Sequence, residues 1–244
     1  MAGAIRLRLE TNRQAKARRS GQRRKDVVEG HLKCSGGNML GIETIRVFSL
    51  VFFVSLVVGF AFGGFFGRKR RDLGPAKASN ESNFVLLYHV WHILIVFPLF
   101  FILVGIAMPG WVFGTVLNLS FQGAEYLQVL SVPLLLIAIT LLDWSARALG
   151  QFMDTHIQVL QKHELVTSGP YSRIRHPSYT SAMIFFLANT LLYLNIIMLI
   201  AFLAVVAIVY KRAILEEELL ASEDGFGQEY RDYMKRTGRF LPRL

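Results

Sequence analysis

Cysteine is almost absent from this sequence, since Cys34 is the only one among 244 residues. A single thiol excludes an intrachain disulfide framework and a zinc site built from several thiolates. Charged residues are also scarce, at 18% of the chain, and the 17 acidic residues are outnumbered by 27 Lys and Arg. No strand–Gly-rich loop–helix pattern is present, which excludes a Rossmann-type nucleotide fold.

Apolar residues make up 53% of the chain. They gather in runs near 20 residues, the length that crosses a bilayer as a helix. One straight helix over 179–210 would overshoot the hydrocarbon, so we expect a hairpin that turns near Asn195. The sequence therefore predicts an all-α, polytopic membrane bundle of about five transmembrane helices and a cytoplasmic C-terminal helical segment. The predicted spans are about 47–66, 84–108, 126–142, 179–194 and 196–214.

The net charge of +10 fits a membrane protein whose cytoplasmic flanks are rich in Lys and Arg. A nucleic-acid partner would require a basic folded face with reading elements, and none is found outside the N-terminal tail. The loop 109–122 carries no Lys or Arg, whereas 68–77, 147–175 and the segment from Lys211 onward carry many. Five spans then place the charged loops in the cytoplasm, and the protein is predicted to be a multi-pass membrane protein with its site on that side.

Residues 1–41 form a strongly basic tail that breaks this charge rule, because five spans leave it on the outer side. Three interpretations remain open: a disordered tail at a lipid surface, an Arg-rich transit peptide, or translation that starts at Met39. A disordered tail before a membrane domain at 42–244 is the simplest of them.

Two features of the first spans have structural and functional interpretations. Gly59, Gly63 and Gly67 share one helix face, which favours close helix packing over a re-entrant bend. His89 and His92 also share a face, but no carboxylate or cysteine accompanies them. Hydrogen bonding between helices is therefore favoured over metal binding, and no metal is predicted.

The longest polar passage between apolar runs is 163–179. Pro170 and Pro177 restrict the backbone and push Gly169 and His176 toward extended geometry, while Gly169 also permits a tight turn or a close approach to a ligand. A stiff polar loop beside apolar helices predicts a binding site at the mouth of the bundle.

Two ordered motifs carry a family resemblance. The first is Leu165-Val-Thr-Ser-Gly-Pro-Tyr171 followed by Arg175-His-Pro-Ser-Tyr179. The second is Arg212-Ala-Ile-Leu-Glu216-Glu217 followed by Phe226-Gly-Gln-Glu-Tyr-Arg-Asp-Tyr233. Together they resemble the isoprenylcysteine carboxyl methyltransferase family of membrane enzymes, over about 90 residues from Gln158 to the end. Taken alone, Arg175 and Arg212 are typical of interfacial anchors and 216–218 of a solvated helix face; the two motifs in order favour a site.

The resemblance implies a cofactor, S-adenosyl-L-methionine, bound within 158–179 and 211–233. It implies that Arg212 is the catalytic and substrate-binding residue, gripping a carboxylate with its planar fork. The cofactor-binding residues that it implies are Gln158, His163, Glu164, Leu165, Val166, Tyr171, His176, Pro177, Ser178, Tyr179 and Glu216.

The leading hypothesis is carboxyl O-methylation of an isoprenylcysteine-like, lipophilic or prenylated acceptor in a lipid membrane. A carboxylate acceptor is already ionised, so catalysis requires mainly positioning and desolvation. Phospholipid N-methylation and small-thiol S-methylation on the same architecture are the alternatives. A non-catalytic scaffold or a transporter is the alternative of another class, but transporters usually place ionisable residues at midspan, and here they lie at span ends.

Overall fold

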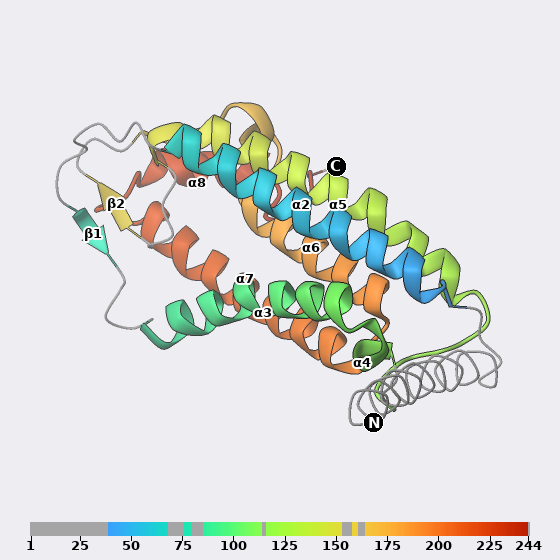
Figure 1. Ribbon diagram of the computed structural model, residues 1–244. Helices are drawn as coiled ribbons and strands as arrows, with labels where there is room; N and C mark the ends of the chain where they lie inside the picture. The colour runs from blue at the N-terminus through green and yellow to red at the C-terminus, as the bar shows by residue number, and fades with distance from the viewer. Residues whose placement is uncertain are drawn as a thin grey trace, which may run out of the picture.

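The computed structural model describes residues 39–67, 76–79, 85–113, 116–152, 158–160 and 164–243. Long helices run side by side and form the body of this part of the chain (Figure 1). They are α2 (Ile42–Gly67), α3 (Val85–Ala107), α5 (Ala124–Leu149), α6 (Pro177–Tyr193) and α7 (Ile196–Ala221). The predictions for the tail before residue 39 and for the basic run 68–71 lie outside the described residues, and so do the side chains of His89 and His92.

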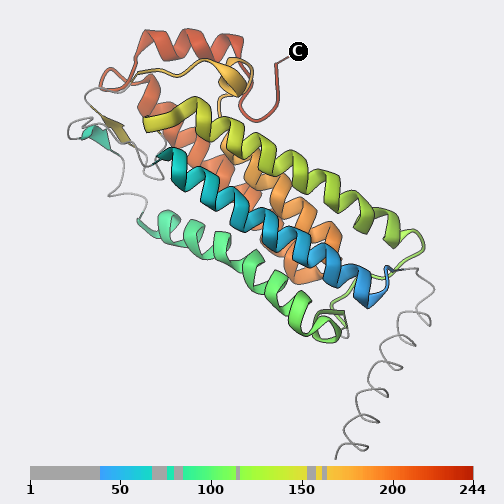
Figure 2. The ribbon, with the colours of Figure 1, turned by 45° about the horizontal axis from the view of Figure 1, so that its top comes forward.

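Short elements lie at the two ends of the long helices. The helix α4 (Pro109–Phe113) follows α3 within a stretch predicted to be a loop. At the other end, the 3₁₀ helix η3 (Gly169–Ser172) and the helix α8 (Gln228–Arg236) lie beside the C-terminal part of α5 (Figure 2). A further 3₁₀ turn, η2 (Gly150–Phe152), closes α5. The two segments that carry the sequence motifs therefore meet at one end of the bundle.

The helical prediction holds for the body of the chain, with one addition. Strands β1 (Ala76–Ser79) and β2 (Gln158–Leu160) pair antiparallel, with Ala78 opposite Val159. These segments are about 80 residues apart in sequence. Strands of three or four residues carry little periodic signal, so an all-α prediction missed them.

Two helices extend beyond the apolar runs that predicted them. The helix α5 continues to Leu149, where Arg147 forms an ion pair with Asp143 at i,i+4. The helix α7 continues from its apolar part through Lys211 to Ala221, because Ala, Leu and Glu are good helix formers. Both α5 and α7 are long and apolar enough to cross a membrane. The second motif is thus a direct continuation of α7.

The α6–α7 turn falls where the sequence predicts it, at Leu194 and Asn195. Leu194 adopts a left-handed conformation with φ of 43° and ends α6. Asn195 caps α7 by accepting a hydrogen bond from the Ile197 amide at 2.9 Å, and its amide donates to Asn118 at 3.0 Å. The Leu119 amide donates to the Leu194 carbonyl at 2.7 Å. This turn is therefore tied to the α4–α5 connection at the end of the bundle opposite η3.

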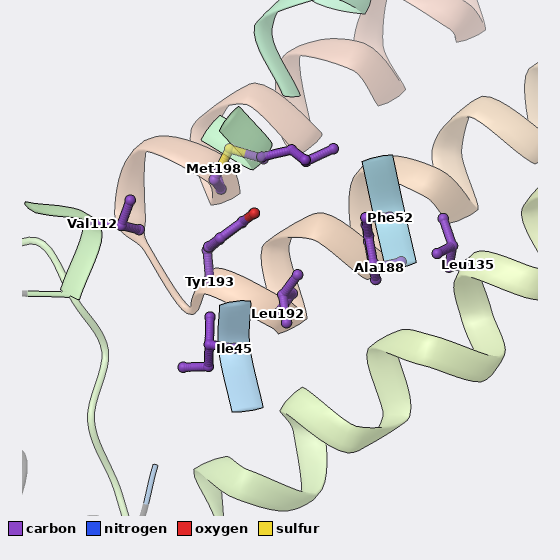
Figure 3. Packing of buried hydrophobic residues seen from close by; sticks show 9 residues of the cluster. Ile45, Phe52, Val112, Leu135, Ala188, Leu192, Tyr193 and Met198 are labelled. Carbon is purple, nitrogen blue, oxygen red and sulfur yellow. The ribbon is translucent and has the colours of Figure 1, made fainter. Parts of the chain in front are cut away.

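The core joins all five long helices. Ile45, Phe52, Leu135, Tyr193 and Met198 come from α2, α5, α6 and α7 and are at most 1% exposed (Figure 3). Ile102 of α3 belongs to the same cluster. The Tyr193 hydroxyl is satisfied by Ser49 at 2.9 Å. This packing sets the relative heights of the helices and so the position of their ends.

The most extensive helix pairing is that of α5 with α6. Small buried residues line it, among them Ala138 and Ala188, and the Ser181 hydroxyl donates to the Ala138 carbonyl at 2.7 Å. Small side chains allow two helix backbones to approach closely. The pairing places the first turn of α6, where the first motif ends, beside the last turns of α5.

Candidate active site

The first motif folds into a tight turn that rests on α5. Gly169 has a φ of 60°, so the extended geometry predicted for it is wrong and the tight turn is confirmed. Pro170 follows at the start of η3, a position that suits its fixed φ. The Ser172 hydroxyl donates to the Gly169 carbonyl at 2.7 Å. The turn buries Tyr171, which is 7% exposed.

The C-terminal segment after α8 pairs with the motif loop along its backbone. The Arg175 and His176 amides donate to the carbonyls of Gly238 and Arg239, at 2.8 and 3.1 Å. The Gly238 amide donates to the Arg173 carbonyl at 3.0 Å. These bonds fix the segment that leads into α6, which begins at Pro177. The last residues of the chain are thus part of the loop's fold.

The helix α8 packs its aromatic residues under the loop. Tyr230 and Tyr233 are at most 3% exposed. The Tyr233 hydroxyl donates to the Tyr171 carbonyl at 2.6 Å. Burial raises the pKa of the Tyr233 phenol to about 12, so it stays protonated and remains a donor at neutral pH. The second motif therefore supports the backbone of the first.

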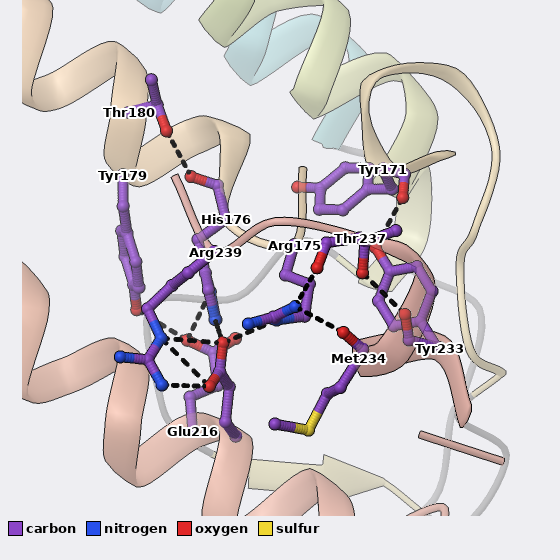
Figure 4. A network of polar contacts seen from close by, with 11 residues as sticks. Tyr171, Arg175, His176, Tyr179, Thr180, Glu216, Tyr233, Met234, Thr237 and Arg239 are labelled. Atoms are coloured by element: carbon purple, nitrogen blue, oxygen red, sulfur yellow. Dashed lines mark hydrogen bonds and ion pairs between the residues drawn. The ribbon is translucent and has the colours of Figure 1, made fainter. Parts of the chain in front are cut away.

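A buried carboxylate lies at the centre of the polar cluster. Glu217 is 3% exposed and accepts from the Arg175 Nε at 2.8 Å and the Arg239 Nη2 at 2.6 Å. The His176 Nε2 lies 3.2 Å from the same carboxylate. Figure 4 shows Arg175, His176 and Arg239 converging from the loop and the C-terminal segment. The bonds to Glu217 raise the pKa of the Arg239 guanidinium above its ordinary value.

A second polar set faces the other side of His176. The imidazole is stacked on the Tyr179 ring, with centroids 5.3 Å apart and planes 10° from parallel. The Tyr179 hydroxyl donates to Glu216 at 2.8 Å and accepts from the Arg212 Nε at 3.4 Å. Arg212 is 3% exposed, and its guanidinium lies 5.9 Å from the centroid of the Tyr179 ring. A carboxylate, a phenol and a guanidinium thus form one continuous chain.

The structure brings together some of the predicted site residues and not others. Tyr171, His176, Tyr179, Arg212 and Glu216 gather at the end of the bundle, with Pro177 buried and Ser178 half-buried between them. Leu165 and Val166 are half-buried, and Glu164 is exposed. Gln158 lies on β2 without a described side chain, and His163 lies outside the described residues. The described residues hold no group of three potential metal ligands.

Sequence reasoning missed the residues at the centre of the cluster. In the sequence, Glu217 lies in a stretch that equally suits a solvated helix face, Arg175 also suits an interfacial anchor, and Arg239 lies outside both motifs. One signal in the sequence points to Glu217. Adjacent residues of a helix point about 100° apart, so Glu216 and Glu217 cannot both face the same partner, and the second carboxylate requires a partner of its own.

A family model described as the isoprenylcysteine carboxyl methyltransferase family matches residues 131–222. The matched range contains α6, α7 and both carboxylates of the cluster.

A solved structure of the eukaryotic intramembrane Ras methyltransferase ICMT matches this chain with a TM-score of 0.45 and 20% sequence identity. The similarity covers 68% of this chain and 54% of that one, so the present chain spans about half the length of that protein. No curated protein matches the chain. The matched range contains Arg175, His176 and Glu217 of the polar cluster, whereas Arg239 lies outside it.

Proposed function

We propose that this protein is an integral-membrane, S-adenosylmethionine-dependent methyltransferase that methylates the carboxylate of an isoprenylcysteine-like lipophilic acceptor. The observation that carries the proposal is the chain Glu216–Tyr179–Arg212, which places an anion and a buried cation on either side of one phenol. It lies within the residues that match the methyltransferase family.

The side chains present fit the chemistry of the cofactor. S-adenosylmethionine carries an ammonium group, ribose hydroxyls and a carboxylate, and when bound it supplies a methyl group made electrophilic by a sulfonium. Glu216 is half-buried and offers an acceptor for the ammonium or a ribose hydroxyl. The His176 ring offers a nitrogen that can form a hydrogen bond with the cofactor, and Tyr171 and Tyr179 add aromatic surface.

Arg212 is the residue proposed to hold the acceptor. A guanidinium presents N–H donors in a planar fork that matches the two oxygens of a carboxylate. Arg212 lies one helical turn before Glu216 and is buried, so pairing takes place where water screens it weakly. The protein thereby orients the carboxylate of the acceptor and excludes water. Because this nucleophile is already ionised, no general base is required.

The charge distribution supports a bundle of about five spans with the site in the cytoplasm. Exposed cations of the described residues gather at the site end, including Arg147, Arg173, Lys211 and Arg231, whereas the partly exposed Arg46 at the other end is paired with Glu43. The connection 116–123 and the Leu194–Asn195 turn at the other end carry none. By the positive-inside rule the site end faces the cytoplasm.

The test has two arms on purified protein in detergent. Direct titration should show S-adenosylmethionine binding that is weakened by His176→Ala and by Glu216→Ala and unchanged by Glu218→Ala. Glu218 is an exposed carboxylate on the same helix, so it controls for charge removal. Unchanged affinity in the first two variants, with both folded, would contradict the proposed cofactor site.

Radiolabelled methyl transfer to farnesylcysteine, phosphatidylethanolamine and a small thiol then identifies the acceptor. Transfer to farnesylcysteine is the expected result. Transfer to the amine or thiol would support the other methyltransferase activities, and absence of cofactor binding would support a scaffold or a transporter.

A further inference from the structure

The buried carboxylate of Glu217 connects three segments that are distant in sequence. Arg175 and His176 come from the motif loop, and Arg239 comes from the C-terminal segment. Arg175 also donates to the carbonyls of Met234 (at 3.1 Å) and Thr237. Apart from His176, none of these residues is required to touch the cofactor or the acceptor under the proposed function.

The contacts at Glu217 determine where His176 carries a proton. Arginine is always charged in proteins, and a carboxylate bound by two guanidinium groups is ionised and can only accept hydrogen bonds. The His176 Nε2, 3.2 Å from this carboxylate, must therefore be the protonated nitrogen. The other nitrogen, Nδ1, then lies toward the second set, 3.8 Å from the Glu216 carboxylate.

The ring of His176 is held in plane as well as at its nitrogen. Tyr179 stacks on it, and Phe240 packs against it with ring centroids 6.1 Å apart. Its backbone amide donates to the Arg239 carbonyl. Arg239 therefore acts on His176 twice, through the backbone and, with its side chain, through Glu217.

We propose that Glu217 and Arg239 are positioning residues that fix the ring orientation and the tautomer of His176, with Nε2–H on Glu217 and Nδ1 toward the cofactor. The inference rests on the proposed function for what Nδ1 faces. Under this proposal the C-terminal segment, through Arg239, contributes to the function of the site. A partner that orients a functional histidine through its far nitrogen is a recurring device in proteins.

A stabilising role alone is a poor explanation of the cluster. Taking a carboxylate and two guanidinium groups out of water costs free energy that their attraction offsets only in part, so buried ion pairs are weak contributors to stability. Neighbouring exposed pairs such as Lys235 with Asp232 incur no such cost. The clearest consequence of this buried cluster is that it fixes the orientation and the tautomer of the His176 ring.

The experiment uses the full chain, labelled with ¹⁵N-histidine, in detergent. The variant Arg239→Gln removes the cation but keeps a donor, and Arg239→Lys keeps the charge. Arg236→Gln is the matched control, because Arg236 is exposed on α8 and makes no contact with Glu217 in the described structure. Thermal unfolding verifies that each variant is folded.

The imidazole spectrum tests the positioning without any cofactor. The wild-type protein should show His176 protonated at Nε2. In Arg239→Gln the two ring nitrogens should become more alike as both tautomers are populated, with Arg239→Lys partly restoring the spectrum and Arg236→Gln leaving it unchanged. A wild-type ring protonated mainly at Nδ1, or a spectrum that Arg239→Gln does not alter, would overturn the proposal.

Cofactor titration tests the consequence. Arg239→Gln should weaken S-adenosylmethionine binding about tenfold, the scale of one charge-assisted hydrogen bond. In a His176→Ala background, Arg239→Gln should change the affinity for S-adenosylmethionine by less than about twofold, because its effect acts through His176. Equal effects in both backgrounds would refute positioning through His176. If the wild-type protein does not bind the cofactor at all, the proposed function fails, and the spectrum still decides the tautomer.

Discussion

Arg212 is the residue proposed to hold the carboxylate of the acceptor. It is 3% exposed beside Tyr179, and lysine at this position would keep the charge but lose the planar fork. We expect Arg212→Lys to lower kcat/KM for farnesylcysteine by about 1–3 kcal/mol in transition-state terms while leaving cofactor affinity nearly intact. Steady-state kinetics with the acceptor varied at saturating cofactor measure the first effect, and direct titration the second.

The neighbouring cation supplies the control for this prediction. Lys211 is exposed on the same helical turn, so Lys211→Gln should leave both quantities unchanged. Should Arg212→Lys instead abolish cofactor binding, the assignment of Arg212 to the acceptor would be wrong.

Among the elements, the η3 turn depends most on a single residue type. Gly169 has a φ of 60°, and a Cβ there would lie 3.2 Å from the Trp144 Nε1 and 3.3 Å from the Ala148 Cβ. Both neighbours belong to α5, so alanine would strain the backbone and press the turn away from this helix. We expect Gly169→Ala to lower the free energy of unfolding by about 1–2 kcal/mol, from the left-handed conformation alone. Thermal unfolding in detergent measures the loss.

Gly41 provides a comparison at the start of α2. A Cβ at this position meets no atom within 4 Å, so Gly41→Ala should change the unfolding temperature little. Equal effects of the two substitutions would show that the turn does not require glycine. Because η3 carries Tyr171, cofactor affinity should fall with Gly169→Ala and not with Gly41→Ala.

At the scale of the whole molecule, the packed structure already includes the last residues of the predicted tail 1–41. Met39 and Leu40 pack against the main core, and the Leu40 amide donates to the Gln128 Oε1 at 2.8 Å. A chain that begins at Met39 should therefore insert into membranes and keep its cofactor affinity. Membrane fractionation and cofactor titration measure these outcomes, and loss of both would show that the basic tail is required for folding.

A shorter chain tests the limit of this tolerance. Beginning at Val47 removes Leu40 and Ile45, and Ile45 is 1% exposed in the core. Loss of a buried isoleucine side chain alone costs at least about 2 kcal/mol. The chain from Val47 should unfold at a clearly lower temperature than the chain from Met39.

Much of this protein is readable from residue type and order. Helix positions follow from apolar run length, the α6–α7 turn from a run too long for one span, and the tight turn at Gly169 from glycine before proline. The two motifs identify Tyr171, His176, Tyr179, Arg212 and Glu216 as residues that the structure then gathers together. These signals are local, because each depends on residues within a few turns of one another.

The partners of Glu217 could not be read in this way. Glu216 and Glu217 are the same residue type, side by side, and only the packing of α7 against the loop makes Glu217 the buried one. Its hydrogen-bond partners Arg175 and Arg239 lie 42 and 22 residues away in the sequence. The two strands β1 and β2 that pair with each other are separated by a longer stretch of sequence. Contacts between distant segments depend on how the helices pack in three dimensions, and no local pattern of residues encodes which charge will meet which.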